Sequence, residues 1–281
     1  MPISGSMTPI SLQNRAVLAV EGADAPAFLQ GLITHDIALL APGRPVFAGL
    51  LSPQGKALFD FHLHAGDDGM ILIDVAATAA DALLRRLSIY KLRKAVTLER
   101  RDDLAVLAGR RGEGPPDARW PAVGGRWVGA AGSAPNGSDD YDAHRLAVGV
   151  PDSADIGSDE LLWLETGADL LDGVSFTKGC YVGQENTARM HHRDKVRRRL
   201  VPVTLAGDPG DAVEVKDAAG RACGKLRSRR GADAIVHLRL ESAGQPLFLG
   251  DAALTVRRPA WLDAAWPDEV GPDSTGPEPA Q

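Results

Sequence analysis

Residues 173–185 read Gly-Val-Ser-Phe-Thr-Lys-Gly-Cys-Tyr-Val-Gly-Gln-Glu, and this stretch is the most informative part of the chain. A short apolar strand is expected to run into a turn here, because Gly179 and Gly183 let the backbone bend tightly and approach a ligand. Residues 184–193 contain enough helix formers to begin a helix directly after the turn. The stretch therefore places Cys180 in a turn just before a helix.

The surroundings of Cys180 predict a reactive thiol. A helix N-terminus and the neighbouring Lys178 both favour the negatively charged thiolate form. The alternative is that Cys180 is a small, inert core residue, as lone cysteines usually are.

The composition is that of an ordinary globular protein. The chain has 281 residues, of which 44% are hydrophobic and 24% charged, and this length predicts two or three packed units. The formal net charge of −6 argues against a surface built as a whole to bind nucleic acid or anionic lipid. The two cysteines lack the dense pattern of secreted domains, and no apolar run has the length of a membrane span. We therefore expect a cytoplasmic protein without a membrane partner.

Apolar periodicity predicts a mixed α+β organisation in the first hundred residues. A turn is expected at residues 52–55, because Ser-Pro-Gln-Gly separates two alternating segments. The expected strands are 16–20, 47–51, 57–64 and 70–75, and the expected helices are 25–32 and 79–90.

The later part of the chain changes from mixed structure to short strands. Strands are expected at 104–108 and 126–130, followed by a helix that Asp139 or Asp140 caps and that runs through Leu146. Short β-type runs after Val196 predict a small barrel or sandwich. The runs are 200–205, 212–215, 234–240 and 253–256. The predicted units are 1–100, 101–195 and 196–262, with a disordered tail at 263–281.

Residues 178–185 match the signature Lys-Gly-Cys-[Phe/Tyr]-x-Gly-Gln-Glu of a known family. On this motif and several shorter segments, the chain resembles the YgfZ-type folate-binding proteins, which are relatives of the glycine-cleavage T-protein. The resemblance spans roughly residues 10–260. The shorter segments are 28–36, 51–56, 58–60, 90–93 and 197–199.

The resemblance implies an α+β fold of the T-protein type, with mixed α/β subdomains around a central folate cleft and a C-terminal β-barrel. It also implies a tetrahydrofolate-binding accessory protein for the assembly or maintenance of iron–sulfur clusters. Its expected partners are iron–sulfur assembly proteins and client enzymes. The alternative is a folate-dependent aminomethyl or one-carbon transferase.

Two departures from the T-protein pattern disfavour direct aminomethyl transfer. Ala147 stands where the T-protein carries a pterin-binding glutamate, and Asp60 is a single acid where the T-protein has an acidic pair. Asp60 is either the remaining acid of the folate site or a solvated strand residue. His35 replaces the asparagine of the family pattern, and we expect it to be a surface or hydrogen-bonded histidine.

Cys180 and Lys178 are the expected working residues, and six further residues are assigned to folate. The carboxylate of Glu165 can accept two parallel hydrogen bonds from the pterin, or it caps a surface turn. The ring of Tyr181 can stack on the folate, or it packs in the core. The assigned set is Glu165, Tyr181, Gln184, Glu185, Arg189 and Asp60.

Basic residues are concentrated at 189–199 and again at 225–230. RNA binding is one interpretation, but no interleaved aromatic residues are present to stack on bases, so no specific nucleic-acid partner is expected. The preferred interpretation is a patch for the glutamate tail of folate or for an acidic partner, and a solvated helix end is the third. No metal site within the chain is predicted, because Cys180 and Cys223 are too few to hold a cluster.

Overall fold

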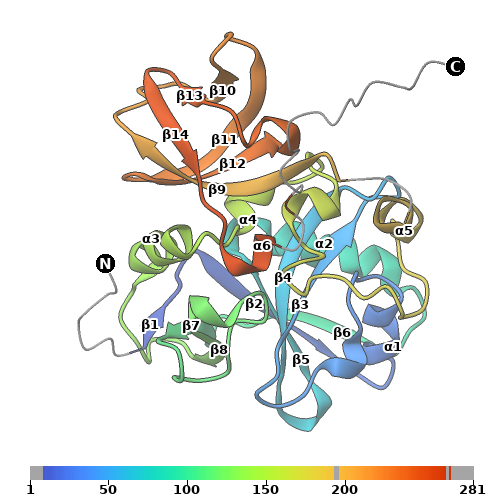
Figure 1. Cartoon of the computed structure of the whole chain (residues 1–281). Coiled ribbons are helices and arrows are strands. Elements are labelled where there is room, and N and C mark those ends of the chain that lie inside the picture. The colour runs from blue at the N-terminus through green and yellow to red at the C-terminus, as the bar shows by residue number, and fades with distance from the viewer. Residues whose placement is uncertain (1–8, 193–195, 264–265, 267–281) are drawn as a thin grey trace, which may run out of the picture.

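A five-stranded antiparallel sheet organises the first hundred residues (Figure 1). The structure is a computed structural model and describes residues 9–192, 196–263 and 266. The strand order in this first sheet is β3-β4-β5-β2-β6. Its elements are β2 (Arg15–Glu21), α1 (Ala25–Gln30), η1 (Ile37–Leu39), β3 (Val46–Leu51), β4 (Ala57–Ala65), η2 (Asp67–Gly69), β5 (Ile71–Ala76), η3 (Ala77–Ala79), α2 (Ala80–Lys91) and β6 (Thr97–Arg100).

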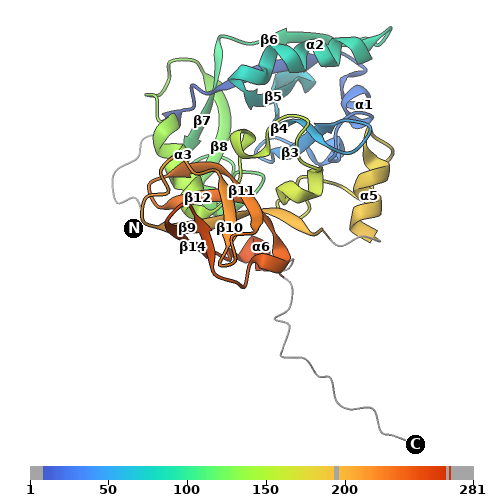
Figure 2. The same ribbon diagram turned by 90° about the horizontal axis from the view of Figure 1, so that it is seen from above.

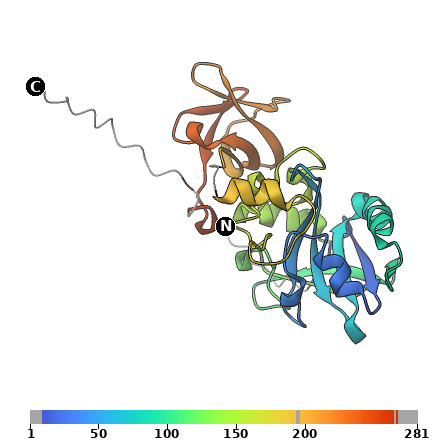
Figure 3. The ribbon, with the colours of Figure 1, turned by 90° about the vertical axis from the view of Figure 1, so that its right-hand side faces the viewer.

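The two faces of the first sheet differ in polarity, and β4 shows why. Successive side chains of a strand point to opposite faces, so Phe61 and Leu63 lie on one face while His62 lies on the other. The apolar face packs with helices α1 and α2 in one hydrophobic cluster. Helix α2 lies on the outer side of the sheet, away from the C-terminal strands (Figures 2 and 3). The polar face is directed into the molecule.

A smaller sheet and several short helices follow. Its strand order is β1-β7-β8, so β1 at the start of the chain pairs with a strand about a hundred residues later. The elements are β1 (Ile10–Ser11), β7 (Leu104–Gly109), η4 (Pro121–Val123), β8 (Gly125–Ala130), α3 (Ser138–Val148), α4 (Ser153–Ile156), η5 (Trp163–Thr166) and α5 (Gln184–His192).

The C-terminal strands close into a six-stranded barrel, in the order β10-β11-β12-β9-β14-β13 (Figure 1). Its interior is filled by buried aliphatic residues such as Val201, Val203 and Val236. The elements are β9 (Arg198–Ala206), β10 (Glu214–Asp217), β11 (Ala222–Arg230), β12 (Asp233–Arg239), η6 (Leu240–Ser242), β13 (Leu247–Leu249), β14 (Ala252–Val256) and α6 (Ala260–Asp263).

The predicted α+β fold with a C-terminal β-barrel is confirmed. The predicted cap of α3 is wrong, because Gly137 precedes the helix while Asp139 and Asp140 lie inside its first turn. The predicted unit boundaries stay predictions, and most of the predicted tail, 264–265 and 267–281, lies outside the described residues. Among the described residues, no helix is long and apolar enough to cross a membrane.

Candidate functional site

The segment that precedes Cys180 is anchored to the core although it forms no strand, contrary to the prediction. The Gly173 carbonyl accepts hydrogen bonds from the indole of Trp163 and the hydroxyl of Thr34. The Ser175 amide donates to the Thr34 carbonyl at 3.0 Å. The chain therefore reaches the motif from a fixed point in the interior.

Lys178 fastens the motif to the turn that follows α1. Its Nζ atom donates to the carbonyls of Gln30 at 2.7 Å, Ile33 at 2.7 Å and His35 at 2.9 Å. Burial lowers the pKa of Lys178 to about 8, against the opposing effect of the Asp36 charge. The ammonium also lies 5.2 Å from the centre of the buried Tyr181 ring. Lys178 therefore binds backbone carbonyls, and it is a positioning residue for the loop.

Cys180 is exposed and lies between the anchored Lys178 and the buried Tyr181. Gly183 has a φ of +84°, and a Cβ atom added there would lie 2.5 Å from the Ser52 carbonyl oxygen, so this position requires glycine. The other thiol, Cys223, is buried and donates to the Arg221 carbonyl. The fold thus presents one accessible thiol on a loop, residues 178–183, that is anchored at both ends. We call this loop the Cys180 ridge.

Helix α5 begins just after this ridge and lies beside the β3–β4 end of the first sheet (Figure 2). The side chain of Asn186 donates to the Gln54 carbonyl at 2.8 Å. At the other end of the helix, the His191 ring stacks on Phe176 with ring centres 3.7 Å apart. Both contacts fix the helix against the parts of the chain that also fix Cys180.

Three of the predicted folate residues lie on α5. Gln184 is half-buried at the first position, whereas Glu185 and Arg189 are exposed. The Arg189 guanidinium donates to the Asn186 side chain at 2.7 Å. These residues lie along a helix surface close to Cys180 in the sequence.

The polar face of the first sheet carries a set of buried charges that the sequence analysis did not identify. Asp74 of β5 accepts hydrogen bonds from Arg15 at 2.7 Å and from Arg126 of β8 at 2.6 Å. Asp117 forms a two-pronged ion pair with Arg119, at 3.0 and 2.8 Å. We call Arg15, Asp74, Asp117, Arg119, Arg126 and Asp152 the buried ionic network.

The arginines of this network stabilise the ionised form of its aspartates. The Arg126 and Arg15 guanidinium groups hold the pKa of Asp74 well below its usual range, despite the opposing effect of burial. Arg119 does the same for Asp117. The network joins the first sheet to the smaller sheet and to the segment before α4.

Asp60 and His62 lie at the edge of the network and are less fully satisfied. Asp60 is buried, so the solvated alternative is wrong, and it accepts one hydrogen bond from Ser153 at 2.8 Å. Burial and the charge of Asp152 raise the pKa of Asp60. Burial lowers the pKa of His62 to about 3, so this imidazole is neutral.

Unpartnered nitrogen atoms are gathered around Asp74. In the described part of the chain, His62 Nδ1, His64 Nε2 and Arg126 Nη2 are buried and have no hydrogen-bond partner. His64 Nε2 lies 3.9 Å from the nearer Asp74 oxygen, which is too far for a hydrogen bond. Unpaired buried polar groups are costly, so this corner of the network has the chemistry of a site for a polar ligand.

Glu165 lies elsewhere, at the contact between η5 and the barrel. It accepts a hydrogen bond from the Leu162 amide at 3.2 Å and lies 3.7 Å from His237 Nε2 of β12. Burial raises the pKa of Glu165. These contacts agree with the turn-capping alternative for Glu165, and in the described part of the chain Glu165 forms no hydrogen bond or ion pair with Asp60 or Tyr181.

Much of the predicted basic patch is neutralised within the chain. Arg199 is buried and pairs with Asp169 at 2.7 Å, so it does not face a ligand. The ion pairs of β11 are Arg227 with Glu160, Arg229 with Asp208 and Arg230 with Asp139. Residues 193–195 of the patch lie outside the described residues.

The unpartnered groups on the polar face of the first sheet include hydrogen-bond donors and acceptors, whereas the six predicted folate residues are spread over β4, η5, the motif loop and α5. A pterin edge presents both hydrogen-bond donors and acceptors. Asp60 and His62 Nδ1 can accept hydrogen bonds, while the free nitrogen of Arg126 can donate one. Among the six predicted folate residues, Asp60 alone lies on this polar face, at an alternate position of β4 to His62.

Known proteins with similar folds and sequences define the family. An aminomethyltransferase T of the glycine cleavage system from Bartonella henselae has the same fold, with a TM-score of 0.71 over 92% of this chain and 87% of that chain, at 16% identity. Residues 197–264 match the CAF17 C-terminal beta-barrel domain.

Proteins with similar sequences identify the family more narrowly than the fold does. The mitochondrial iron–sulfur cluster assembly factor IBA57 of mouse is 32% identical over 309 aligned residues, which cover 92% of this chain and 86% of the mouse protein. The chain belongs to the IBA57 family. Human IBA57 is 31% identical and covers 89% of the chain, and the IBA57 homologue of Mycosarcoma maydis is 36% identical and covers 71%. In the human and fungal comparisons, the chain covers 84% and 58% of the relative.

The prediction of a cytoplasmic protein is contradicted by these relatives, which are named as mitochondrial proteins. The prediction rested on the low cysteine content and the absence of an apolar span. Low cysteine content distinguishes a reducing compartment from the secretory pathway, but it does not distinguish between two reducing compartments.

Proposed function

We propose that this IBA57-family protein is an accessory factor for iron–sulfur cluster assembly and that Cys180 is its working group. The observation that supports this role most directly is the exposed thiol on a ridge held by Lys178 and Gly183. The relatives that cover most of the chain are named as iron–sulfur cluster assembly factors. The more specific proposal is that the protein has the role of the YgfZ-type folate-binding proteins.

The number of accessible thiols defines how Cys180 would act. An iron–sulfur cluster is normally held by four thiolates, whereas this chain has two cysteines and one of them is buried. Cys180 would therefore supply one ligand to a cluster whose other ligands come from an assembly protein or a client enzyme. The cluster is then cargo that passes between partners, and the rigid ridge fixes where it is held.

A reconstitution tests this function. An apo-enzyme that requires a [4Fe–4S] cluster, mixed with a cluster donor protein, should regain activity faster when this protein is present. The reason is that an exposed, fixed thiol lowers the entropic cost of bringing donor and acceptor together. Equal rates of reactivation with and without the protein would contradict the proposal.

Tetrahydrofolate is the proposed cofactor, and Asp60, His62 and Arg126 are the residues that would hold its pterin ring. Bound tetrahydrofolate would supply a reduced carrier of one-carbon units. The support is the group of unpartnered buried nitrogens on the same face of the first sheet as Asp60, together with the aminomethyltransferase fold. Direct aminomethyl transfer is the weaker candidate, because Ala147, in place of the expected acid, is exposed at the end of α3.

A calorimetric titration distinguishes the two candidate positions of folate. Asp60→Ala should weaken tetrahydrofolate binding by about tenfold, because a buried hydrogen bond to a ligand donor is lost. Glu165→Gln should leave the affinity unchanged, since Glu165 contacts the barrel. If Glu165→Gln weakens binding and Asp60→Ala does not, folate binds at η5 instead. If neither variant weakens binding, neither residue belongs to the folate site.

A further inference from the structure

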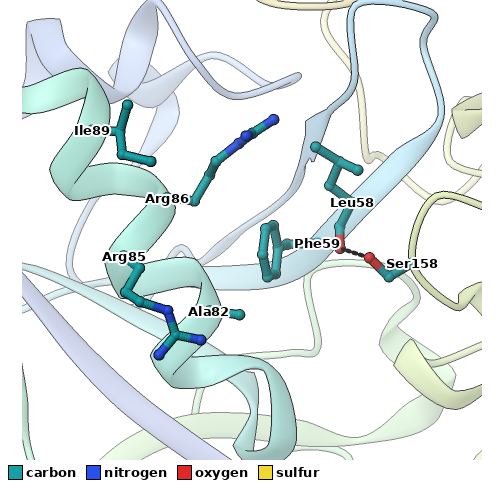
Figure 4. A pocket seen from close by; sticks show the side chains of 7 residues that line it. All are labelled: Leu58, Phe59, Ala82, Arg85, Arg86, Ile89 and Ser158. Atoms are coloured by element: carbon teal, nitrogen blue, oxygen red, sulfur yellow. Dashed lines mark hydrogen bonds between the residues drawn. The ribbon is translucent and has the colours of Figure 1, made fainter.

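A shallow pocket of about 310 Å³ lies between the outer face of α2 and the start of β4 (Figure 4). Phe59 projects toward α2 between Ala82 and Arg86, and Ile89 lies one turn further along the helix. Ile89 is 66% exposed. The pocket therefore combines an apolar floor with an accessible edge, which is the form of a site for one large apolar side chain.

Two arginines, Arg85 and Arg86, line this pocket, and the positive charge continues to the end of α2 and beyond it, although the chain as a whole is negative. Residues 82–98 contain no acidic residue, and the basic residues there are Arg85, Arg86, Lys91, Arg93 and Lys94. Across the described ranges, none of these five forms a salt bridge, and the buried Nε atom of Arg86 has no hydrogen-bond partner. The β11 arginines, by contrast, are paired with acids inside the chain. The charge on α2 is thus available to an outside partner.

The pocket and the Cys180 motif pack against the same part of the first sheet. Val182 of the motif packs against the same hydrophobic cluster as Phe59 and Tyr90. The turn before β4 also receives the side chain of Asn186 from α5, through the Gln54 carbonyl. A partner bound at the pocket would therefore touch the hairpin that supports the motif.

We propose that this pocket docks an acidic peptide segment of a partner protein, with one large apolar side chain of that segment in the pocket. The charge complementarity between an acidic segment and the α2 arginines selects the partner, and the apolar floor selects the anchor residue. A nucleic acid fits less well, because binding of single strands relies on open aromatic rings and the Tyr90 ring is covered by Arg86 at 5.8 Å. The docking goes beyond the proposed cluster role and can be measured without it.

Fluorescence anisotropy with a labelled peptide tests the proposal. The probe is the octapeptide Glu-Asp-Glu-Leu-Phe-Asp-Glu-Asp, added to the full chain at low and at high salt. Arg85→Glu should weaken binding by at least about tenfold at low salt, because one attraction becomes a repulsion. Ile89→Ser should weaken binding by about fivefold at both salt concentrations, because an apolar contact is lost. Both side chains are exposed, so both variants should fold.

Two matched variants on the barrel serve as controls. Arg229→Glu makes the same charge change at a paired arginine, and Val213→Ser removes another exposed apolar side chain, which is 54% exposed against 66% for Ile89. Neither should change the peptide affinity. The proposal is overturned if Arg85→Glu binds like the wild type, or if a peptide with Ser-Ser in place of Leu-Phe binds equally well. It is also overturned if an RNA oligonucleotide or an anionic vesicle binds the wild type more tightly than the peptide does and loses this affinity in Arg85→Glu.

Discussion

Cys180→Ala is expected to reduce cluster-dependent reactivation of the apo-enzyme by more than about a hundredfold, because a direct ligand is worth more than the groups that orient it. The free energy of unfolding should change by less than about 0.5 kcal/mol, since the side chain is exposed. Reactivation kinetics and urea denaturation of the same preparation measure the two quantities. The combination separates a chemical role from a packing role.

The second cysteine provides the control inside the same chain. Cys223→Ala should cost about 1 kcal/mol of stability, because the thiol is buried in the barrel, and it should leave reactivation unchanged. Iodoacetamide should modify Cys180 in the folded wild type before Cys223 reacts. If Cys180→Ala reactivates the apo-enzyme at the wild-type rate, Cys180 is not the working group.

The sequence predicts the outline of the fold because local patterns were strong in most elements. The alternation in β4 and the Ser-Pro-Gln-Gly turn locate the first hairpin, and the motif glycines locate the start of α5. The sequence places Cys223 in a β segment, but the full extent of β11 was not predicted, and the pairing register of this strand shifts between Leu226 and Ser228. A bulge of this kind interrupts the period of two on which strand prediction depends.

The buried ionic network could not be predicted from local patterns. The alternation of Phe61 and Leu63 with His62 indicates that one face of β4 is polar, but it does not say whether that face meets water or other polar groups. The partners that bury it, Arg119 and Arg126, come from more than 50 residues further along the chain. Only the tertiary fold brings these charges together.

Sequence proximity was also misleading for Lys178. Its position two residues before Cys180 suggested that the ammonium assists the thiol. In the structure the side chain turns inward and donates to three backbone carbonyls near the end of α1. The motif lysine therefore anchors the loop, and a reactive Cys180 stays a prediction that now rests on its exposure.

The largest effect on stability is expected from Asp74→Asn. This substitution removes the negative charge between Arg15 and Arg126 and leaves buried positive charge without compensation. Breaking a buried ion pair from one side costs about 3–5 kcal/mol, so urea denaturation at neutral pH should show a loss of that size. An exposed pair offers the comparison, because Asp208→Asn removes the partner of Arg229 and should cost less than about 1 kcal/mol.

The pH dependence of this loss follows from the direction of the pKa shift. The pKa of Asp74 is lowered in the folded state, so its contribution is fully present above about pH 4, the unfolded pKa, and is lost as the pH falls through the folded value. The difference between the wild type and Asp74→Asn should therefore shrink below about pH 4. Asp60→Asn should behave differently, because burial raises the pKa of Asp60 and the amide oxygen can still accept the Ser153 hydrogen bond. A loss for Asp60→Asn as large as that for Asp74→Asn would mean that Asp60 is an ionised member of the network, and it would remove the reason for assigning it to a ligand.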